Sequence, residues 1–247
     1  MTVLEKGMLP GRLKDIVNRV DHLGSISVAD LSAQFGVAVE TIRRDLRLLE
    51  EQGYLRRTHG GASSLLDSHD VLAFGSRQSL NSDAKEAMAR HALPFIHEEQ
   101  TLMLDPSSSC WYLARMLPDM PLTVITNSLR IVFDLVHKPN IRVIGVGGRY
   151  YEKYGAFLGT ITVDHIHEFQ ADLCFHSCAG FMDESGAWDS NALNAGVKRA
   201  MRRSSRDHIM LCDKSKEERG GFMQIANAER IHCRINEDGV VGAMPQG

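Results

Sequence analysis

The 247-residue sequence lacks several features that mark other classes of protein. It has no apolar run near the roughly 20 residues that cross a bilayer, so we expect no membrane span. Its N-terminus lacks the pattern of a secretory signal, so we expect a cytoplasmic protein. Its five cysteines are odd in number and scattered through apolar stretches, which favours reduced thiols over a disulfide framework.

Net charge is also small. The formal charge is −3, so the chain is no polycation, and attraction to nucleic acid requires a local cluster of basic residues. Hydrophobic residues make up 43% of the chain, enough for one small and one larger domain. Cys174, His176 and Cys178 share a face of a candidate strand, but no further ligand pair lies nearby. We therefore expect a buried strand there, with no metal and no cofactor.

A basic face on a candidate helix is the strongest signal near the N-terminus. At helical spacing, one arc of roughly 100° carries Glu40, Arg43, Arg44, Arg47 and Glu51. Ile42, Leu46 and Leu49 fall together on another side. Arginine reads guanine edges through two hydrogen bonds and also clamps phosphates, so the basic face favours contact with nucleic acid. The alternative is a solvated amphipathic helix whose arginines contact nothing.

The flanking segments predict a winged helix-turn-helix. Residues 12–23 have apolar side chains at helical spacing, residues 27–30 fit a capping box, and Gly36 suits the tight turn before the third helix. Residues 54–61 resemble a short strand and a basic turn, as in a wing. We therefore interpret residues 1–62 as a DNA-binding domain whose last helix enters the major groove. The expected DNA contacts are Val39, Glu40, Thr41, Arg43, Arg44, Arg47, Arg56, Arg57 and His59.

Residues 63–82 show little periodicity and are interpreted as a linker, and residues 83–247 as a second domain. In that domain helical patterns alternate with short apolar runs, which predicts a parallel sheet with helices on both faces. The expected strands are 101–105, 122–126, 142–146, 171–178 and 208–212, and the expected helices are 84–96, 111–117, 129–136 and 192–204. The chain is therefore expected to be α/β, with an N-terminal winged helix-turn-helix domain before a parallel α/β domain.

Polar residues follow several of the expected strands. Ligands bind at the carboxyl ends of strands in such sheets, and hydroxyls at a helix N-terminus suit an anion. Lysines farther along the chain have the charge to bind a phosphate, and Asp105 and Asn127 have groups that hydrogen-bond sugar hydroxyls. The alternative for each motif is an ordinary turn or helix cap. The expected ligand contacts are Asp105, Ser107, Ser108, Ser109, Thr126, Asn127, Ser128, Gly147, Gly148, Lys198 and Lys216.

These motifs resemble the DeoR family of bacterial transcriptional regulators. The resemblance rests on residues 41–46, 49–50, Gly53 and 57–62, and continues through 105–109, 126–128, 147–148, 197–201 and 213–216. It implies a sensor domain similar in fold to sugar-phosphate isomerases, in which a phosphorylated sugar changes DNA affinity. The chain departs from the family pattern at the positions where the family usually has Ser, Gly, Glu and an aromatic-glycine pair: Ala38, Ser107, Asn194 and Glu217-Glu218.

The resemblance favours a regulator over an enzyme. We expect a repressor of a carbohydrate catabolism operon whose partners are an operator in double-stranded DNA and a phosphorylated sugar, and which forms a homodimer or homotetramer. The first alternative is a sugar-phosphate isomerase-like enzyme that carries a DNA-binding domain, with Asp105 as its base. Asn194 weakens that alternative because relatives have a carboxylate there. The second alternative is a protein-interaction module with a decayed pocket.

Overall fold

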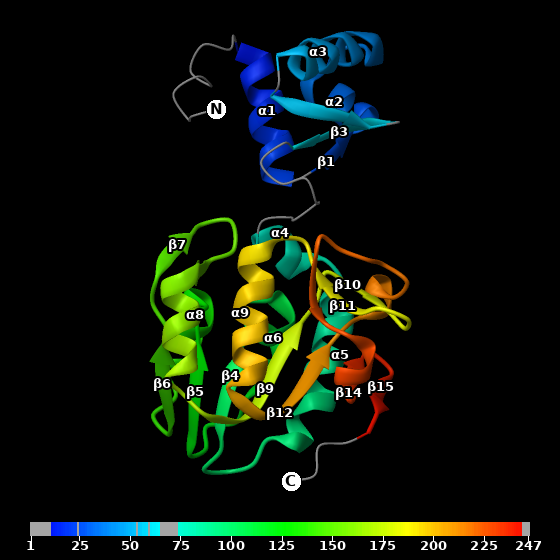
Figure 1. The fold of residues 1–247 in the computed structure, drawn as a ribbon. Helices are drawn as coiled ribbons and strands as arrows, with labels where there is room; N and C mark the ends of the chain where they lie inside the picture. Colours follow the sequence, from blue (N-terminus) through cyan, green and yellow to red (C-terminus); the bar gives the residue numbers. More distant parts are fainter. Residues whose placement is uncertain (1–10, 24, 53, 59, 65–73, 244–247) are drawn as a thin grey trace. The chain divides into compact units, whose positions relative to one another are not determined.

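The chain folds into two compact units, residues 1–76 and 77–247. The computed structural model describes residues 11–23, 25–52, 54–58, 60–64 and 74–243 (Figure 1). Among the helices of these described ranges, none is both long enough and apolar enough to cross a membrane.

The first unit contains three helices and a small antiparallel sheet. Its elements are α1 (Gly11–Leu23), β1 (Ser25–Ser27), α2 (Val28–Phe35), α3 (Val39–Glu51), β2 (Leu55–Thr58) and β3 (Gly61–Ser64). The strand order is β1-β3-β2. One apolar core joins all three helices to the sheet through Ile16, Val17, Val20, Leu31, Ile42, Leu46, Leu49, Leu55 and Ala62. This arrangement confirms the predicted helix-turn-helix followed by a wing.

Local signals account for the bounds of α2 and α3. The hydroxyl of Ser27 accepts a hydrogen bond from the backbone N–H of Asp30 at 3.0 Å, which caps the start of α2. Gly36 ends α2 with φ 63°, a left-handed conformation that costs a glycine little. Ala38 precedes α3, and its methyl side chain cannot accept a hydrogen bond from the free N–H groups in the first turn of that helix.

The strand β1 was not predicted from the sequence. It has three residues, too few for a periodic pattern, and it exists because it pairs with β3, where Ile26 lies opposite Ala62. Gly61 is required at this pairing, since a Cβ there would lie 2.1 Å from the carbonyl oxygen of Ile26. The sheet is therefore set by contacts between distant residues.

The second unit is built on a seven-stranded sheet in the order β15-β14-β12-β9-β4-β5-β6. Neighbouring strands are parallel except at the β14–β15 edge pair, which is antiparallel. The strands are β4 (Thr101–Leu104), β5 (Leu122–Thr126), β6 (Ile141–Gly145), β9 (Ala171–Ser177), β12 (Ser205–Leu211), β14 (Cys233–Asn236) and β15 (Gly239–Gly242). The central strands read as nearly continuous apolar runs because both faces of the sheet are covered.

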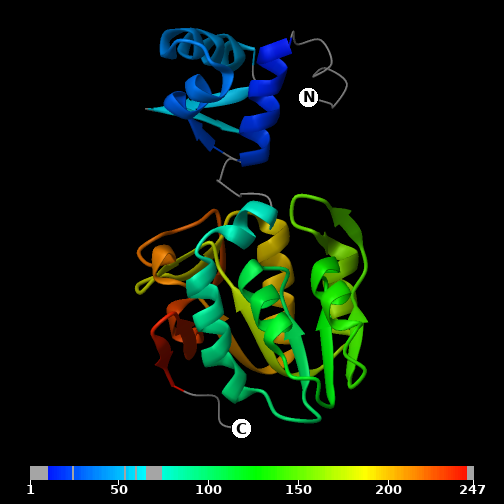
Figure 2. The ribbon, with the colours of Figure 1, turned by 180° about the vertical axis from the view of Figure 1, so that it is seen from behind.

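Helices cover both faces of this sheet. Figure 1 shows α8 and α9 in front of the strands, and the view from behind in Figure 2 shows α5, α6 and α7 on the opposite face. The helices are α4 (Phe74–Ser79), α5 (Ser82–Ala92), α6 (Ser108–Met116), α7 (Leu129–Leu135), α8 (Thr160–His167) and α9 (Ala192–Arg203), with short 3₁₀ turns η2 (Leu93–Phe95), η3 (Lys214–Lys216) and η4 (Ala228–Arg230). This layered sheet confirms the predicted α/β class.

Several short elements lie outside the predicted pattern. A separate antiparallel sheet in the order β10-β11-β13 is formed by Gly180–Met182, Gly186–Asp189 and Met223–Ala226, and a hairpin by β7 (Arg149–Tyr151) and β8 (Ala156–Leu158). The sheet of the second unit is therefore accompanied by antiparallel pairs, which the expectation of a parallel sheet omitted. The helix α4 lies within residues 63–82, the range interpreted from the sequence as a linker.

Candidate functional site

The helix α3 separates its apolar and basic side chains. Ile42, Leu46 and Leu49 are fully buried in the core of the first unit, whereas Arg43 and Arg44 are exposed. Burial of one face anchors the helix, so the opposite face is held in a fixed orientation toward solvent. The exposed side chains of this face, together with half-buried Thr41, are Val39, Glu40, Arg43, Arg44 and Arg47.

The arginines of α3 differ in their partners. Arg43 forms an exposed ion pair with Glu40, with 3.2 Å between Nη1 and Oε2. Arg44 and Arg47 form no ion pair within the described residues, so their full charge faces solvent. Arg12 of α1 instead binds Asp45 at 2.8 Å and fastens α1 to α3. The positive charge on the exposed face is therefore carried mainly by Arg44 and Arg47.

The wing strand β2 is joined to the end of α3. The backbone N–H of Arg57 donates to Oε1 of Glu50 at 2.8 Å, and the Arg57 guanidinium lies 3.8 Å from Oε2 of the same carboxylate. Arg56 pairs with Ser63 through its backbone, and its side chain is not described. His59, also predicted to contact DNA, lies outside the described residues. Glu50 thus fixes the position of the wing relative to α3.

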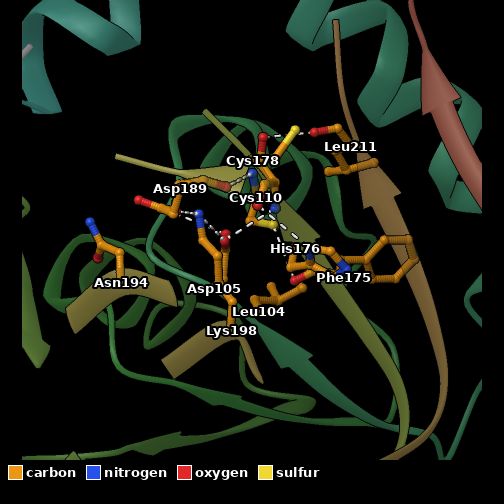
Figure 3. A network of polar contacts seen from close by, with 12 residues as sticks. Leu104, Asp105, Cys110, Phe175, His176, Cys178, Asp189, Asn194, Lys198 and Leu211 are labelled. Atoms are coloured by element: carbon orange, nitrogen blue, oxygen red, sulfur yellow. Dashed lines mark hydrogen bonds and ion pairs between the residues drawn. The ribbon is translucent and has the colours of Figure 1, made fainter. Parts of the chain in front are cut away.

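In the second unit, the strand ends bring together a buried lysine and two buried carboxylates. The ammonium of Lys198, on α9, lies 2.5 Å from Oδ2 of Asp189 and 3.3 Å from Oδ2 of Asp105 (Figure 3). Asp105 follows β4, and Asp189 ends β11. We refer to Asp105, Asp189 and Lys198 as the Asp-Lys-Asp cluster. Its formal charge is −1, so Lys198 carries no surplus positive charge.

The titration of this cluster follows from its burial and its charges. Burial by itself lowers the pKa of Lys198, but Asp189 and Asp105 outweigh burial and raise that pKa above its usual value. Burial likewise raises the pKa of Asp105, but Lys198 and the hydrogen bond to Ser107 outweigh it and hold the pKa below the ordinary range. Lys198 and Asp105 are therefore both charged at neutral pH.

Asp105 also organises the loop that follows β4. Its Oδ1 accepts from the backbone N–H of Ser107 at 3.0 Å, and its Oδ2 accepts from the N–H of Ser177 at 3.1 Å. The Ser107 hydroxyl caps α6 by accepting from the N–H of Cys110 at 3.2 Å. Ser108 and Ser109 complete a buried first turn of α6. Residues 105–109, predicted as one motif, therefore act together in the structure.

Ser177 connects the Asp-Lys-Asp cluster to a second ion pair. Its hydroxyl accepts from Nζ of Lys216 at 3.0 Å, while its N–H donates to Asp105. Lys216 in turn lies 3.1 Å from Oδ2 of Asp213, at the end of β12. The structure thus places predicted residues Asp105, Lys198 and Lys216 in one connected network, through Ser177 at the end of β9.

The loops after β5 and β6 make contacts with other elements. The Thr126 hydroxyl donates to the carbonyl of Leu104 at 2.7 Å, the Asn127 amide donates to the carbonyl of Phe157 at 2.7 Å, and Ser128 caps α7. The carbonyl of Gly147 accepts from Thr162 at 3.1 Å. Gly148 has φ 149°, and a Cβ there would lie 2.1 Å from the Thr162 hydroxyl. These residues show no hydrogen bond to Lys198 within the described part of the chain.

The hydroxyl of Ser109 and the side-chain carbonyl oxygens of Asn127 and Asn194 are buried and have no hydrogen-bond partner in the described residues. Buried polar atoms are almost always hydrogen-bonded, and one left without a partner costs about 1–3 kcal/mol. Asn194 lies on α9, one turn before Lys198, and Figure 3 shows it at the side of the cluster. Such atoms mark positions where a bound polar molecule would supply the missing partners.

Sequence reasoning missed Asp189 and Ser177. Asp189 reaches the site because the β10–β11 hairpin folds back beside α9, and no local pattern marks a hairpin of such short strands. Ser177 was treated as part of a buried strand, and its role depends on the parallel register that places it opposite Leu211. A polar residue at the end of an apolar run was the one available signal.

The positions that depart from the family pattern have local explanations. Glu217 pairs with Arg234 at 3.1 Å, and the Arg234 guanidinium stacks on the ring of Phe181 at 4.4 Å. Glu218 adopts φ 56°, a left-handed conformation that glycine adopts more readily. The backbone turn after η3 therefore keeps a shape suited to glycine, although the side chain is a glutamate.

Comparison with known proteins places both units in one family. Residues 12–67 match the family described as the DeoR-like helix-turn-helix domain, and residues 80–238 match the DeoR C terminal sensor domain. The L-fucose operon activator of Haemophilus influenzae is 38% identical over 90% of this chain and 89% of its own length. The L-fucose operon activator of Escherichia coli is 37% identical over 94% and 96%. The transcriptional repressor AccR of Agrobacterium fabrum is 32% identical over 87% and 84%.

Proposed function

Because this chain belongs to the DeoR family of transcriptional regulators, we propose that it binds an operator through α3 and the wing and that a phosphorylated sugar controls this binding. The family membership makes it a DNA-binding transcription regulator and not an enzyme. The operator contacts, the effector and the direction of regulation are the parts proposed here.

Exposure and charge support α3 as the recognition helix. Arg44 and Arg47 have no ion-pair partner within the described residues and lie on the face opposite the buried Ile42 and Leu46. A recognition helix in the major groove contacts base edges from its N-terminal half, where Val39, Glu40 and Thr41 are also found. Arg57 and, from the sequence, Arg56 and His59 are proposed to contact phosphates from the wing.

Operator binding is tested with Arg43→Ala and Arg44→Ala. Each change is expected to weaken operator binding by about 1–3 kcal/mol if the side chain makes a bidentate base contact. Arg90→Ala is the matched control, because it removes one charge from an exposed ion pair with Glu86 in the second unit. Binding is measured at one salt concentration with specific and random DNA. Unchanged affinity in both α3 variants would contradict the assignment of α3 as the recognition helix.

The effector is proposed to occupy the strand ends that carry the Asp-Lys-Asp cluster. The single observation that carries this proposal is the set of unpartnered buried oxygens of Ser109, Asn127 and Asn194 around charged, fully organised side chains. The first turn of α6, with Ser107, Ser108 and Ser109, suits a phosphate because its N–H groups and helix dipole favour an anion.

The charges of the site indicate which residues contact the sugar hydroxyls and which contact the phosphate. The sequence interpretation assigned Lys198 to the phosphate, but its ammonium is already paired with two carboxylates. We therefore assign the Asp-Lys-Asp cluster to the sugar hydroxyls, which hydrogen-bond equally well to carboxylates and ammonium groups. Lys216 stays a candidate for the phosphate, with Thr126, Asn127, Ser128, Gly147 and Gly148 completing the proposed site.

Ser109→Ala offers a selective test of the effector site. The Ser109 hydroxyl has no hydrogen-bond partner in the described residues, so its removal relieves the cost of an unpaired buried group and is expected not to lower the melting temperature of the free protein. Phosphorylated sugars are expected to raise the melting temperature of the wild type and to raise that of Ser109→Ala less. The unphosphorylated sugars serve as controls. A wild type that no sugar phosphate stabilises would contradict the proposed site.

The protein acts either as a repressor or as an activator of its operon. The sequence interpretation favoured a repressor, whereas two relatives at 37–38% identity are named L-fucose operon activators and AccR is named a repressor. The names of the two L-fucose operon activators support a carbohydrate operon as the target. In vitro transcription from the operator promoter, with and without the protein, distinguishes the two roles, because a repressor lowers the transcript and an activator raises it.

A homo-oligomer is proposed because operators are commonly two-fold sites that symmetric proteins read. Light scattering of the purified chain, with and without operator DNA, tests this point. A particle with the mass of one chain bound to one operator would contradict it.

A further inference from the structure

Two cysteines meet at the ends of neighbouring parallel strands in the second unit. Cys178 directly follows β9, Cys212 directly follows β12, and the preceding residues Ser177 and Leu211 lie opposite each other in the strand register. The two Sγ atoms are 3.5 Å apart. Cα atoms of neighbouring strands lie roughly 4.8 Å apart, within the separation that a disulfide spans. Little backbone movement is therefore needed to join the two sulfurs.

The surroundings of the pair favour reaction at Cys178. Both thiols are buried in an apolar cluster with Phe181 and Ala187. The hydrogen bond with Cys212 lowers the pKa of Cys178 and outweighs burial, which raises it, and the ammonium groups of Lys216 and Lys198 lower it further. Thiolates rather than thiols are the reactive form of cysteine, so Cys178 is the nucleophile of the pair.

We propose that Cys178 and Cys212 form a reversible dithiol–disulfide site whose oxidant is a small hydroperoxide. In the first step the Cys178 thiolate attacks one peroxide oxygen, the O–O bond breaks, and Cys178 becomes a sulfenic acid while hydroxide leaves. In the second step the Cys212 sulfur attacks the sulfenic sulfur, a disulfide forms, and the second oxygen leaves as water. The proton that Cys178 lost on becoming a thiolate neutralises the hydroxide, and the proton of Cys212 leaves with the second oxygen. With hydrogen peroxide, two thiols and one peroxide therefore give one disulfide and two waters.

The other cysteines lack this combination. Burial raises the pKa of Cys110, whose Sγ donates to the carbonyl of Phe175 at 3.3 Å. Burial also raises the pKa of Cys174, and it raises that of Cys233 to about 11. Of the cysteine pairs in the described residues, the Cys178–Cys212 pair is the one with sulfurs in hydrogen-bond contact. Oxidation is therefore selective for this pair.

The disulfide acts on the network of the strand ends. Ser177, adjacent to Cys178, donates to Asp105 and accepts from Lys216, and Asp213, adjacent to Cys212, pairs with Lys216. A sulfur–sulfur bond of about 2.05 Å draws these two strand ends together. Ser177 and Asp213, each next to a bonded cysteine, are the network residues that the disulfide constrains. Because thiols inside cells are held reduced, such a bond forms under oxidant and is reversed afterwards.

The test counts thiols and does not depend on DNA or effector binding. The reduced full-length chain is treated with hydrogen peroxide at neutral pH, denatured, alkylated with iodoacetamide and weighed by mass spectrometry. The native chain is expected to lose two of its five alkylation sites, with a linked peptide joining Cys178 to Cys212. Dithiothreitol is expected to restore both sites. Retention of all five sites, or a disulfide between other cysteines, overturns the proposal.

Variants separate the two steps. Cys212→Ala is expected to stop at the sulfenic acid of Cys178, which dimedone labels, whereas Cys178→Ala is expected to take no label. Cys174→Ala is the matched control because it removes a buried thiol of the same strand, and it is expected to form the disulfide as the wild type does. Dimedone labelling of Cys178→Ala at the wild-type level, or loss of the disulfide in a folded Cys174→Ala, also overturns the proposal.

Discussion

The ammonium of Lys198 lies 2.5 Å from the carboxylate of Asp189, and both side chains are more than nine-tenths buried. Asp105 shares the same ammonium at 3.3 Å. Two buried carboxylates thus share one ammonium. Removal of either carboxylate leaves the other paired, whereas removal of the lysine leaves both with only the more distant charge of Arg77.

Lys198→Met is therefore expected to destabilise the second unit by about 3–5 kcal/mol at pH 7, because breaking a buried ion pair leaves uncompensated charge. Urea denaturation followed by tryptophan fluorescence measures this loss, since both tryptophans, Trp111 and Trp188, lie in the second unit. Arg203→Met, on the exposed side of the same helix, is the control and is expected to change stability by less than about 0.5 kcal/mol.

The loss is also expected to shrink at acidic pH. In the wild type the pKa of Asp105 is held low, so its contribution to stability is present above the unfolded pKa and is lost as pH falls through the folded pKa. Without Lys198, burial raises the pKa of Asp105, and protonation relieves the buried charge. A Lys198→Met penalty that is equal at pH 7 and pH 5 would contradict this account.

Lys85 is expected to make stability rise with pH between about 8 and 10. Burial, together with Lys216, lowers the pKa of Lys85 to about 8, although its Nζ donates to the carbonyl of Arg77 at 2.5 Å. The unfolded state therefore binds more protons than the folded state in this window, and raising the pH favours folding. The effect is expected to be about 1 kcal/mol after allowance for solvent screening.

Urea denaturation at several pH values measures this slope in wild type and Lys85→Met. The variant is expected to lose the rise, whatever its stability at neutral pH. Lys14→Met, exposed in the first unit, is the control and is expected to keep the wild-type slope. An identical slope in wild type and Lys85→Met counts against the lowered pKa.

Ala38→Ser is expected to stabilise α3 by about 1 kcal/mol. Ala38 precedes the helix with φ −59° and ψ 145° and provides no side-chain hydrogen bond to its free N–H groups, which a serine hydroxyl supplies. Amide hydrogen exchange in α3 is expected to slow by about fivefold. Ala33→Ser, exposed within α2, is the control, since a serine inside a helix gives no such gain. Equal exchange rates in the two variants speak against the capping effect.

Arg57→Ala is expected to weaken binding to operator and random DNA alike and to reduce the slope of log affinity against log salt by about one, because each phosphate contact releases about one counterion. Titrations at several salt concentrations measure both quantities. Glu50→Gln is the companion variant, because Glu50 lies beside the Arg57 guanidinium and its loss removes a competing charge. A loss confined to operator DNA would assign base reading to the wing.

The sequence predicted the elements whose signals are local. Leu122–Thr126 has the predicted bounds because an apolar run buried on both sides has clear ends. Gly36 marked the turn between α2 and α3 because few residues adopt its left-handed conformation at low cost. The order of the seven strands and the hairpins could not be predicted, because they depend on pairings such as β4 with β9, which are distant in the chain.

The sequence predicted several residues of the candidate site from their chemistry, but it did not predict which of them contact one another. Asp105 and Ser107 were predicted because a polar run follows an apolar strand and opens a helix. That Lys198 is neutralised by Asp189 could not be predicted, because the hairpin that carries Asp189 shows no periodic pattern. The Cys178–Cys212 contact was missed for a similar reason. The spacing along β9 groups Cys178 with Cys174 and His176, whereas Cys212 follows the neighbouring strand β12.

The pairing of β4 with β9 has a consequence for the order of folding. The N–H of Thr101 donates to the carboxylate of Asp172, 71 residues away, and strands this distant close only after a long loop has been ordered. The core of the first unit, by contrast, is complete within residues 16–62. During synthesis from the N-terminus, the unit that carries α3 therefore completes its core while the strands of the second are still being made. A nascent chain acquires its basic helix face before it acquires the site that is proposed to govern it.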